Sequence, residues 1–338
     1  ASAASVKLTG DTITIEDAGD GVELSVANLE VTAQNILVYG DIQTTGDVIF
    51  SASDDDVLFD ASTPEEVDDL GLSASASGSF FDCSAGSEIT VSGSIHAGGS
   101  VDMKATTSQT RSLLDLTVGN DSTEENLLDD LNFLNVKIGN ADINISGILI
   151  AGGSVSAAAS STIKFSVTGA SLGTFNVPLS LSIAVTDVNV IVTGTVQAGG
   201  DIDFNAESTV DINTTATTGS LPVTIAISVA VVDCHVTVGD ETVGSTSVVS
   251  TNGNIQLSSK ATTEMNTKAA RGASTSGTIS GYFAVGVGVT DVSADIIGNA
   301  TVIAENGSIS VNSVSIEAAT TEALSAKPET TTEEARPL

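Results

Sequence analysis

Aromatic residues are scarce in this sequence of 338 residues. It has no tryptophan, two tyrosines (Tyr39 and Tyr282) and nine phenylalanines, so aromatics make up only 3% of the chain. Few aromatic side chains are therefore available to stack against sugar rings. Because 41% of the residues are nevertheless hydrophobic, the core must be aliphatic, and its many β-branched residues favour strands.

Basic residues are equally scarce. Ten Lys and Arg stand against 43 Asp and Glu, which gives a formal net charge of −33. The ten are scattered from Lys7 to Arg336, so the sequence offers no phosphate-binding stripe and no patch for an anionic membrane. We expect no nucleic-acid partner and no membrane insertion, and any charged partner should be cationic or a metal ion.

Only two histidines and two cysteines are present. His96 and His235 lie in different predicted strands, which leaves little material for a histidine metal site or an acid–base pair. Cys83 and Cys234 are about three repeat units apart, too far for an intrachain bridge. We expect buried free thiols, with an intermolecular disulfide as the alternative.

Three long apolar runs lie at Phe175 to Val192, Leu221 to Val238 and Tyr282 to Ile297. Each has an aspartate near its middle, is rich in Val, Ile and Thr, and is interrupted by Pro or Gly, so membrane-spanning helices are not expected. They are typical of strands that are apolar on both faces. Such strands are either buried under a second layer or form a contact between subunits.

A glycine followed two residues later by Val or Ile recurs six times. The glycines are 53, 54, 47, 53 and 54 residues apart, which is the signature of a repeat protein. Three columns keep their chemistry in all six units. A short polar residue follows each glycine: Asp47, Ser100, Ser154, Asp201, Asn254 and Ser308. Apolar residues stand four positions after it: Phe50, Met103, Ala157, Phe204, Leu257 and Val311. Apolar residues also stand four positions before it: Ile42, Ile95, Leu149, Val196, Val249 and Ile303.

These columns predict an all-β solenoid of about six units of ~53 residues, each with a strand of period two and a glycine corner. Stacking would bury a continuous apolar column. Two or three coils per unit, at about 4.8 Å per coil, would give a rod of roughly 60 to 90 Å. A pair of β-sandwiches is the structural alternative.

The domain organisation follows from the repeats. We assign residues 1–40 to leading and capping strands, 41–325 to the solenoid and 326–338 to a flexible tail or linker. Helix-start signals at Thr63-Pro64-Glu65-Glu66 and Ser122-Thr123-Glu124-Glu125 predict two short inserted helices. The chain begins at Ala1 without a charged-then-apolar signal segment, so we expect a mature, processed or excised portion.

Carboxylates cluster at Asp54, Asp55, Asp56 and Asp60. Carboxylate oxygens are ligands for hard cations, so these four residues are the candidate metal site, with Ca²⁺ as the candidate ion. No EF-hand loop and no nonapeptide calcium array is present, and a solvated acidic face is the alternative interpretation. We assign no other cofactor and no catalytic residue.

The corner sequences Ala97-Gly98-Gly99-Ser100, Ala151-Gly152-Gly153-Ser154 and Ala198-Gly199-Gly200-Asp201, with Thr-, Ser- and Ala-rich strands around them, resemble the repeats of large secreted bacterial adhesins of the filamentous-haemagglutinin kind. The resemblance covers residues 41–323 and is one of repeat style. It implies an extracellular, right-handed parallel β-helix used as a shaft or binding surface.

We therefore expect a non-catalytic extracellular structural protein. It would be a subunit of a surface filament or sheath, or a rod segment of an adhesin, and would associate with itself into a homopolymer or fibre because unpaired strand edges accept another chain. A cell-surface or glycan ligand is compatible with this role. The alternative is a carbohydrate-binding or carbohydrate-cleaving β-helix, which shares the architecture.

Overall fold

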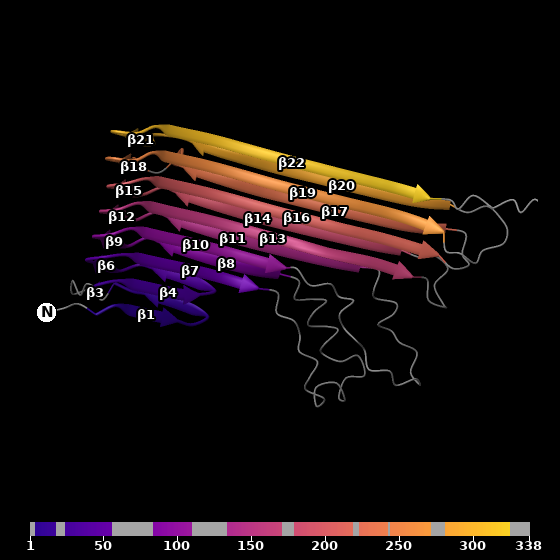
Figure 1. Cartoon of the computed structure of the whole chain (residues 1–338), viewed down its shortest axis with the longest axis horizontal. Coiled ribbons are helices and arrows are strands. Elements are labelled where there is room, and N and C mark those ends of the chain that lie inside the picture. Colours follow the sequence, from indigo (N-terminus) through magenta and orange to yellow (C-terminus); the bar gives the residue numbers. More distant parts are fainter. Residues whose placement is uncertain are drawn as a thin grey trace, which may run out of the picture.

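The strands of this chain form three parallel sheets that are stacked in register (Figure 1). The structure is a computed structural model, and it describes residues 4–17, 24–55, 84–109, 134–170, 179–218, 223–242, 244–271 and 281–324. The described residues contain no helix, and thus none that could span a membrane.

Each sheet takes every third strand of the chain. Sheet A contains β1 (Val6–Thr9), β4 (Leu29–Ala33), β7 (Val48–Asp55), β10 (Val101–Gln109), β13 (Val155–Ala170), β16 (Ile202–Thr218), β19 (Ile255–Arg271) and β22 (Ile309–Leu324). Sheet B contains β2 (Thr12–Ile15), β5 (Asn35–Val38), β8 (Ser84–Val91), β11 (Leu134–Ile145), β14 (Leu179–Val192), β17 (Val223–Val238) and β20 (Gly281–Ile296). Sheet C contains β3 (Leu24–Val26), β6 (Asp41–Thr44), β9 (Ser94–Ala97), β12 (Ile148–Ala151), β15 (Thr195–Ala198), β18 (Ser247–Ser250) and β21 (Thr301–Ala304).

One strand from each sheet makes one coil, so the parallel stacked arrangement of a β-solenoid is confirmed. The predicted number of coils per repeat unit is wrong. Val48 pairs directly with Val101, and Val101 with Val155, so a 53-residue unit is a single coil and not two or three. In the later coils the cause is strand length, because strands of 14 to 17 residues use up most of a unit.

The proportions of the molecule follow from these long strands. Eight stacked strands at about 4.8 Å extend roughly 34 Å, whereas a 17-residue strand extends about 56 Å. The longest axis therefore lies along the strands rather than along the stack (Figure 1). The elongated rod expected from the repeat count is replaced by a broad, flat-sided stack.

The coils widen from the N-terminal end. Val6 pairs with Leu29 and Leu29 with Val48, so the first two coils have 23 and 19 residues. The strands of sheet A lengthen from 4 residues in β1 to 8 in β7 and 17 in β16. Residues 6–38, within the predicted capping segment, contribute β1 to β5 to the same three sheets as the later coils.

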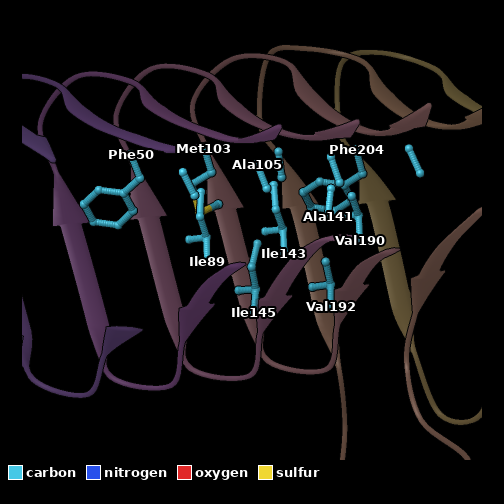
Figure 2. Close-up of a cluster of buried hydrophobic side chains, with 14 of the residues drawn as sticks. Phe50, Ile89, Met103, Ala105, Ala141, Ile143, Ile145, Val190, Val192 and Phe204 are labelled. Atoms are coloured by element: carbon cyan, nitrogen blue, oxygen red, sulfur yellow. The ribbon is translucent and has the colours of Figure 1, made fainter. Parts of the chain in front are cut away.

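The predicted inward column of sheet A is confirmed in five of the six units, whereas Val311 of the sixth unit pairs with Leu257 but is 46% exposed. Phe50, Met103, Ala157, Phe204 and Leu257 pair in register and are fully buried. Figure 2 shows part of this column pointing toward Ile89, Ile143 and Val190 of sheet B. The thin interior suits aliphatic side chains, as the scarcity of aromatics suggested.

The third predicted column is correct in four units and wrong in two. Ile42, Ile95, Leu149 and Val196 are buried in sheet C, but the next coil places Val248, not Val249, in that column. The last coil places Val302 there instead of Ile303. Four residues separate sheet C from sheet A in these two coils, against three in the four earlier ones. A one-residue shift turns a strand's side chains to the opposite face.

The turn from sheet C to sheet A, here called the glycine corner, needs glycine because successive coils approach closely there. A Cβ on Gly152 would lie under 3.0 Å from the carbonyl oxygen of Gly98 in the coil below. Among the described residues only Gly239 and Gly298 have positive φ, so the corner glycines are required by space.

The polar column after each glycine has a specific role. Asp47 Oδ1 accepts a hydrogen bond from the backbone N–H of Ser100 (2.8 Å), and Asp201 Oδ1 accepts one from that of Asn254 (2.7 Å). Equivalent bonds join Asn28 to Asp47, Ser100 to Ser154, Ser154 to Asp201, and Asn254 to Ser308. This corner ladder fixes the register of the coils.

Three predicted features lie outside the described residues. They are the inserted helices at 63–66 and 122–125 and the tail at 326–338.

Candidate interaction surface

The outer surface of sheet B is the most unusual surface of the described molecule, because large apolar side chains point outward from it. In β17 the buried positions alternate with Ile225, Ile227, Val229 and Val231, which face away from the core. Neighbouring strands place the same kind of residue beside them. We call this set the aliphatic face: Val136, Ile138, Leu181, Ile183, Val185, Ile225, Ile227, Val229, Val231, Phe283, Val285, Val287 and Val289.

The aliphatic face carries no charge and is arranged in rows across four strands. One row is Ile138, Val185, Val231 and Val289, and the row beside it is Val136, Ile183, Val229 and Val287. Members on β14 and β17 are half-buried between neighbouring strands, whereas Phe283 and Val289 on β20 are 56% and 54% exposed. The largest contiguous apolar patch of a protein surface is often functional, and patches larger than a few hundred Å² mark interaction sites.

Behind the aliphatic face the polarity is inverted. The inward residues of β14 and β17 at this level include Ser182, Thr186 and Ser228, all fully buried. Thr186 Oγ1 and Ser208 Oγ of sheet A are 2.7 Å apart. A globular strand normally points its aliphatic residues inward and its hydroxyls outward, so this part of sheet B has the reverse of the usual pattern.

Several of the buried hydroxyls hydrogen-bond to one another, whereas Thr224 Oγ1 and Thr263 Oγ1 have no hydrogen-bond partner among the described residues. Thr267 Oγ1 donates to Ser228 Oγ (2.7 Å), Ser228 Oγ donates to Thr214 Oγ1 (2.8 Å), and Thr214 Oγ1 donates to Ser182 Oγ (2.7 Å). This series of hydrogen bonds alternates between sheets A and B. It joins the two sheets without aliphatic bulk, because buried polar groups are tolerated when they are hydrogen-bonded.

The outer surface of sheet A is polar in contrast. On β16 and β19 the outward positions include Asp203, Glu207, Thr262 and Lys260, and Lys260 Nζ lies 2.8 Å from Glu207 Oε1. The two broad faces of the molecule therefore differ, one being charged and hydrated and the other aliphatic.

A row of carboxylates borders the aliphatic face on the side nearer sheet C. Asp187 pairs with Asp233, and Asp233 with Asp291, so three like charges follow one another on adjacent strands. We call these three residues the carboxylate row. Strand spacing places successive members about 5 Å apart, where like charges repel.

The next row is also polar. Asn189 Nδ2 donates to Asp142 Oδ1 (2.9 Å) and to Asp187 Oδ1 (2.6 Å). Burial raises the pKa of Asp142, the hydrogen bond from Asn189 lowers it, and the nearby charges of Asp187 and Glu88 raise it, for a net increase. His235 Nδ1 lies 3.0 Å from Ser293 Oγ.

The candidate calcium residues are only partly described. Asp54 Oδ2 accepts hydrogen bonds from Gln34 Nε2 (2.8 Å) and from the backbone N–H of Gly86 (2.7 Å), so its carboxylate has a structural use. Asp55 contributes its backbone to β7, and Asp56 and Asp60 lie outside the described residues. The described part of the chain has no cluster of three or more His, Cys, Asp or Glu suited to a metal ion.

The remaining sequence candidates are placed as expected where they are described. Cys234 is a buried free thiol whose Sγ donates to the carbonyl of Lys260 (3.4 Å), and burial raises its pKa. Cys83 lies outside the described residues. His96 is on β9 and His235 on β17, in different sheets.

The aliphatic face was only partly anticipated. The three apolar runs include its members on β14, β17 and β20, but not Val136 and Ile138 on β11. Two signals separate the two faces in β14 and β17: serines and threonines mark the inward side in the first part of each strand, and Asp187, Asn189, Asp233 and His235 mark the outward side further along.

The fold defines the class of this protein as an all-β stack of parallel coils, a β-solenoid. No protein-family model matches the chain, and none of the curated proteins or solved structures compared with it is significantly similar.

Proposed function

We propose that this chain is a non-catalytic extracellular structural protein that associates with its own kind through the aliphatic face. It would act as a subunit of a surface filament or sheath, or as a rod segment of an adhesin. The single observation that carries the proposal is the inverted polarity of sheet B, with aliphatic residues outside and hydrogen-bonded hydroxyls inside.

The physical argument concerns the cost of leaving this face in water. Burying apolar surface contributes about 25 cal/mol per Å², so a face of thirteen aliphatic or aromatic side chains is a large unused source of association energy. The chain could bury Val and Ile behind this part of sheet B and instead buries Ser, Thr and the small Ala184, Ala226 and Ala230. Covering the face with a partner recovers that energy and explains the arrangement.

The other features agree with a structural role. The corner ladder and the paired long strands make a rigid body with two broad faces, and the charged face of sheet A would keep an assembly hydrated. The extracellular location and the right-handed winding rest on the resemblance of the repeats to secreted adhesins, and both remain predictions.

A charge placed on each face tests the proposal. We expect wild-type protein to have a mass in light scattering that is a multiple of 33.7 kDa, and assemblies visible by negative-stain electron microscopy. Val229→Lys should be monomeric. The matched control is Thr262→Lys, which replaces a β-branched residue of similar size on the outer face of sheet A and changes the net charge equally. It should assemble like wild type.

Lysine is chosen because it reduces the net negative charge. General repulsion between copies therefore falls in both variants, and a loss of assembly in Val229→Lys alone points to the apolar contact. Wild-type protein that stays monomeric at high concentration, or equal behaviour of the two variants, would overturn the proposal.

A further inference from the structure

We infer that the partner of the aliphatic face is a second copy of this chain, packed face to face with its strands antiparallel to those of the first. The inference rests on the proposed function and adds the identity and the orientation of the partner. A two-fold contact closes a pair, so the pair is the building block from which a filament or sheath would be made through other contacts. It is carried by the regular lattice of the face, its area, and the position of the carboxylate row.

The shape of the face suits another sheet. Its members repeat about 4.8 Å apart across strands and about 6.7 Å apart along them, because they are alternate residues of paired strands. β-Branched side chains on such a lattice interdigitate with an equal lattice, as when two sheets pack about 10 Å apart. A second copy offers the same lattice with the same absence of charge.

The area is sufficient for a specific but modest dimer. Each outward side chain covers about 32 Å² of the sheet plane, so the thirteen members cover about 400 Å² per copy. Two copies with part of the polar rim bury about 1,000 Å², near the lower limit for a specific interface. We therefore expect a dissociation constant of order micromolar.

Electrostatics select this partner and its orientation. The net charge of −33 disfavours an anionic surface, whereas a face-to-face dimer leaves both charged faces of sheet A in water, more than a Debye length apart. The carboxylate row lies on one side of the aliphatic face only. If the strands of two copies were parallel, the two rows would lie opposite each other and repel.

Antiparallel strands separate the two rows. A two-fold axis parallel to the stacking direction reverses the strand direction and places the rows at opposite margins of the interface. In β17 of each copy, Ile225 then faces Val231 of the other copy, and Ile227 faces Val229. With parallel strands each of these residues would face its own equivalent.

Charge complementation distinguishes the two orientations. Ile225→Glu and Val231→Lys should each weaken dimerisation at least about tenfold in sedimentation equilibrium, because a charge is buried against an aliphatic residue. The double variant should recover most of this loss, since the introduced lysine of each copy faces the introduced glutamate of the other. Far-UV circular dichroism checks that each variant folds.

Three results would overturn the inference. One is failure of the double variant to recover, and another is recovery when Ile225→Glu and Ile225→Lys copies are mixed, which requires parallel strands. The third is wild-type protein that stays monomeric and binds neutral phosphatidylcholine vesicles, which also removes the proposed function. In the first two cases the wild type still assembles, so the proposed function survives.

A distance measurement gives an independent test. Thr237 lies on the outer face of β17, beyond the carboxylate row. A nitroxide on Thr237→Cys, in a Cys83→Ser background, should give an inter-copy distance of about 60 Å when strands are antiparallel. A distance under about 25 Å would show parallel strands and contradict the inference.

Discussion

Asp201 illustrates how single residues hold this molecule in register. Its carboxylate accepts the backbone N–H of Asn254 in the next coil, while its own N–H donates to Ser154 Oγ in the coil below. The sequence correctly predicted a column of short polar residues at the corner. Its role in joining coils could not be predicted, because that role depends on which residue lies directly above in the stack.

We predict that Asp201→Ala lowers the free energy of unfolding by about 1 kcal/mol, the usual contribution of one hydrogen bond. Asp201→Asn should retain most of the stability, since asparagine already serves in this column at Asn254. Equilibrium urea denaturation measures the effect.

The matched control is Asp203→Ala, two residues along the same strand region. Burial and the nearby charge of Asp201 raise the pKa of Asp203, so its ionised form is disfavoured in the folded state. Its removal should leave stability unchanged or slightly higher at neutral pH. A loss as large as that of Asp201→Ala would show that the corner ladder has no special role.

At the scale of elements, the same repeat pattern was reliable within strands and failed where a corner changed length. Counting back from Gly200 finds the buried Val196, but counting back from Gly253 finds Val249, which points outward. Runs that are apolar on both faces present a related difficulty. In the first half of β17 the hydroxyls of Thr224 and Ser228 are on the buried side, against the usual preference, and only the outward Asp233 and His235 of the second half follow the usual pattern.

The spacing of coils at the glycine corner gives a prediction at this scale. Gly152→Ala should destabilise the protein by about 1 to 3 kcal/mol, because its methyl group meets the backbone of the coil below and the corner must shift. Differential scanning calorimetry would record a lower melting temperature.

Gly86→Ala is the control for this substitution. A Cβ at Gly86 meets no atom within 4 Å, so we expect a change within about 0.5 kcal/mol. If both alanine variants had the same melting temperature as the wild type, close approach of the coils would not be the reason for glycine at the corner.

For the whole molecule, the sequence predicted the architecture but not the proportions. The repeat period and the columns are visible in the sequence, and they led to the stacked parallel fold. The number of coils per unit depends on strand length, and a strand of 16 residues such as β13 contains no boundary signal that separates it from two shorter strands. The aliphatic face was less predictable. It can be recognised only when one knows which side of sheet B faces the core and which faces outward.

The widening of the coils predicts a gradient of local stability. Strands of 3 to 5 residues in β1 to β4 form few ladder bonds and bury few side chains, whereas β16 and β19 have 17 residues each. In a stack each coil depends mainly on its neighbours. Amides of β1 to β3 should therefore exchange with solvent well before those of β16 and β19.

Hydrogen exchange followed by mass spectrometry tests this gradient with peptides from each coil. Protein at a concentration below the dimer dissociation constant serves as the control, because an interface on β17 and β20 would add protection there. Uniform exchange along the chain would contradict the nearest-neighbour picture and indicate a single cooperative unit.

The corner ladder has a consequence for how such a chain changes over evolutionary time. Every step uses a backbone N–H as the donor and the side-chain oxygen of a short polar residue as the acceptor, so the top of any coil can bond to the bottom of any other at this corner. Ser100 accepts from Ser154 as Ser154 accepts from Asp201. Removal or duplication of one complete coil would leave each corner amide with an acceptor, whereas a partial one would not. Gene duplication can therefore lengthen this protein in whole coils at little structural cost.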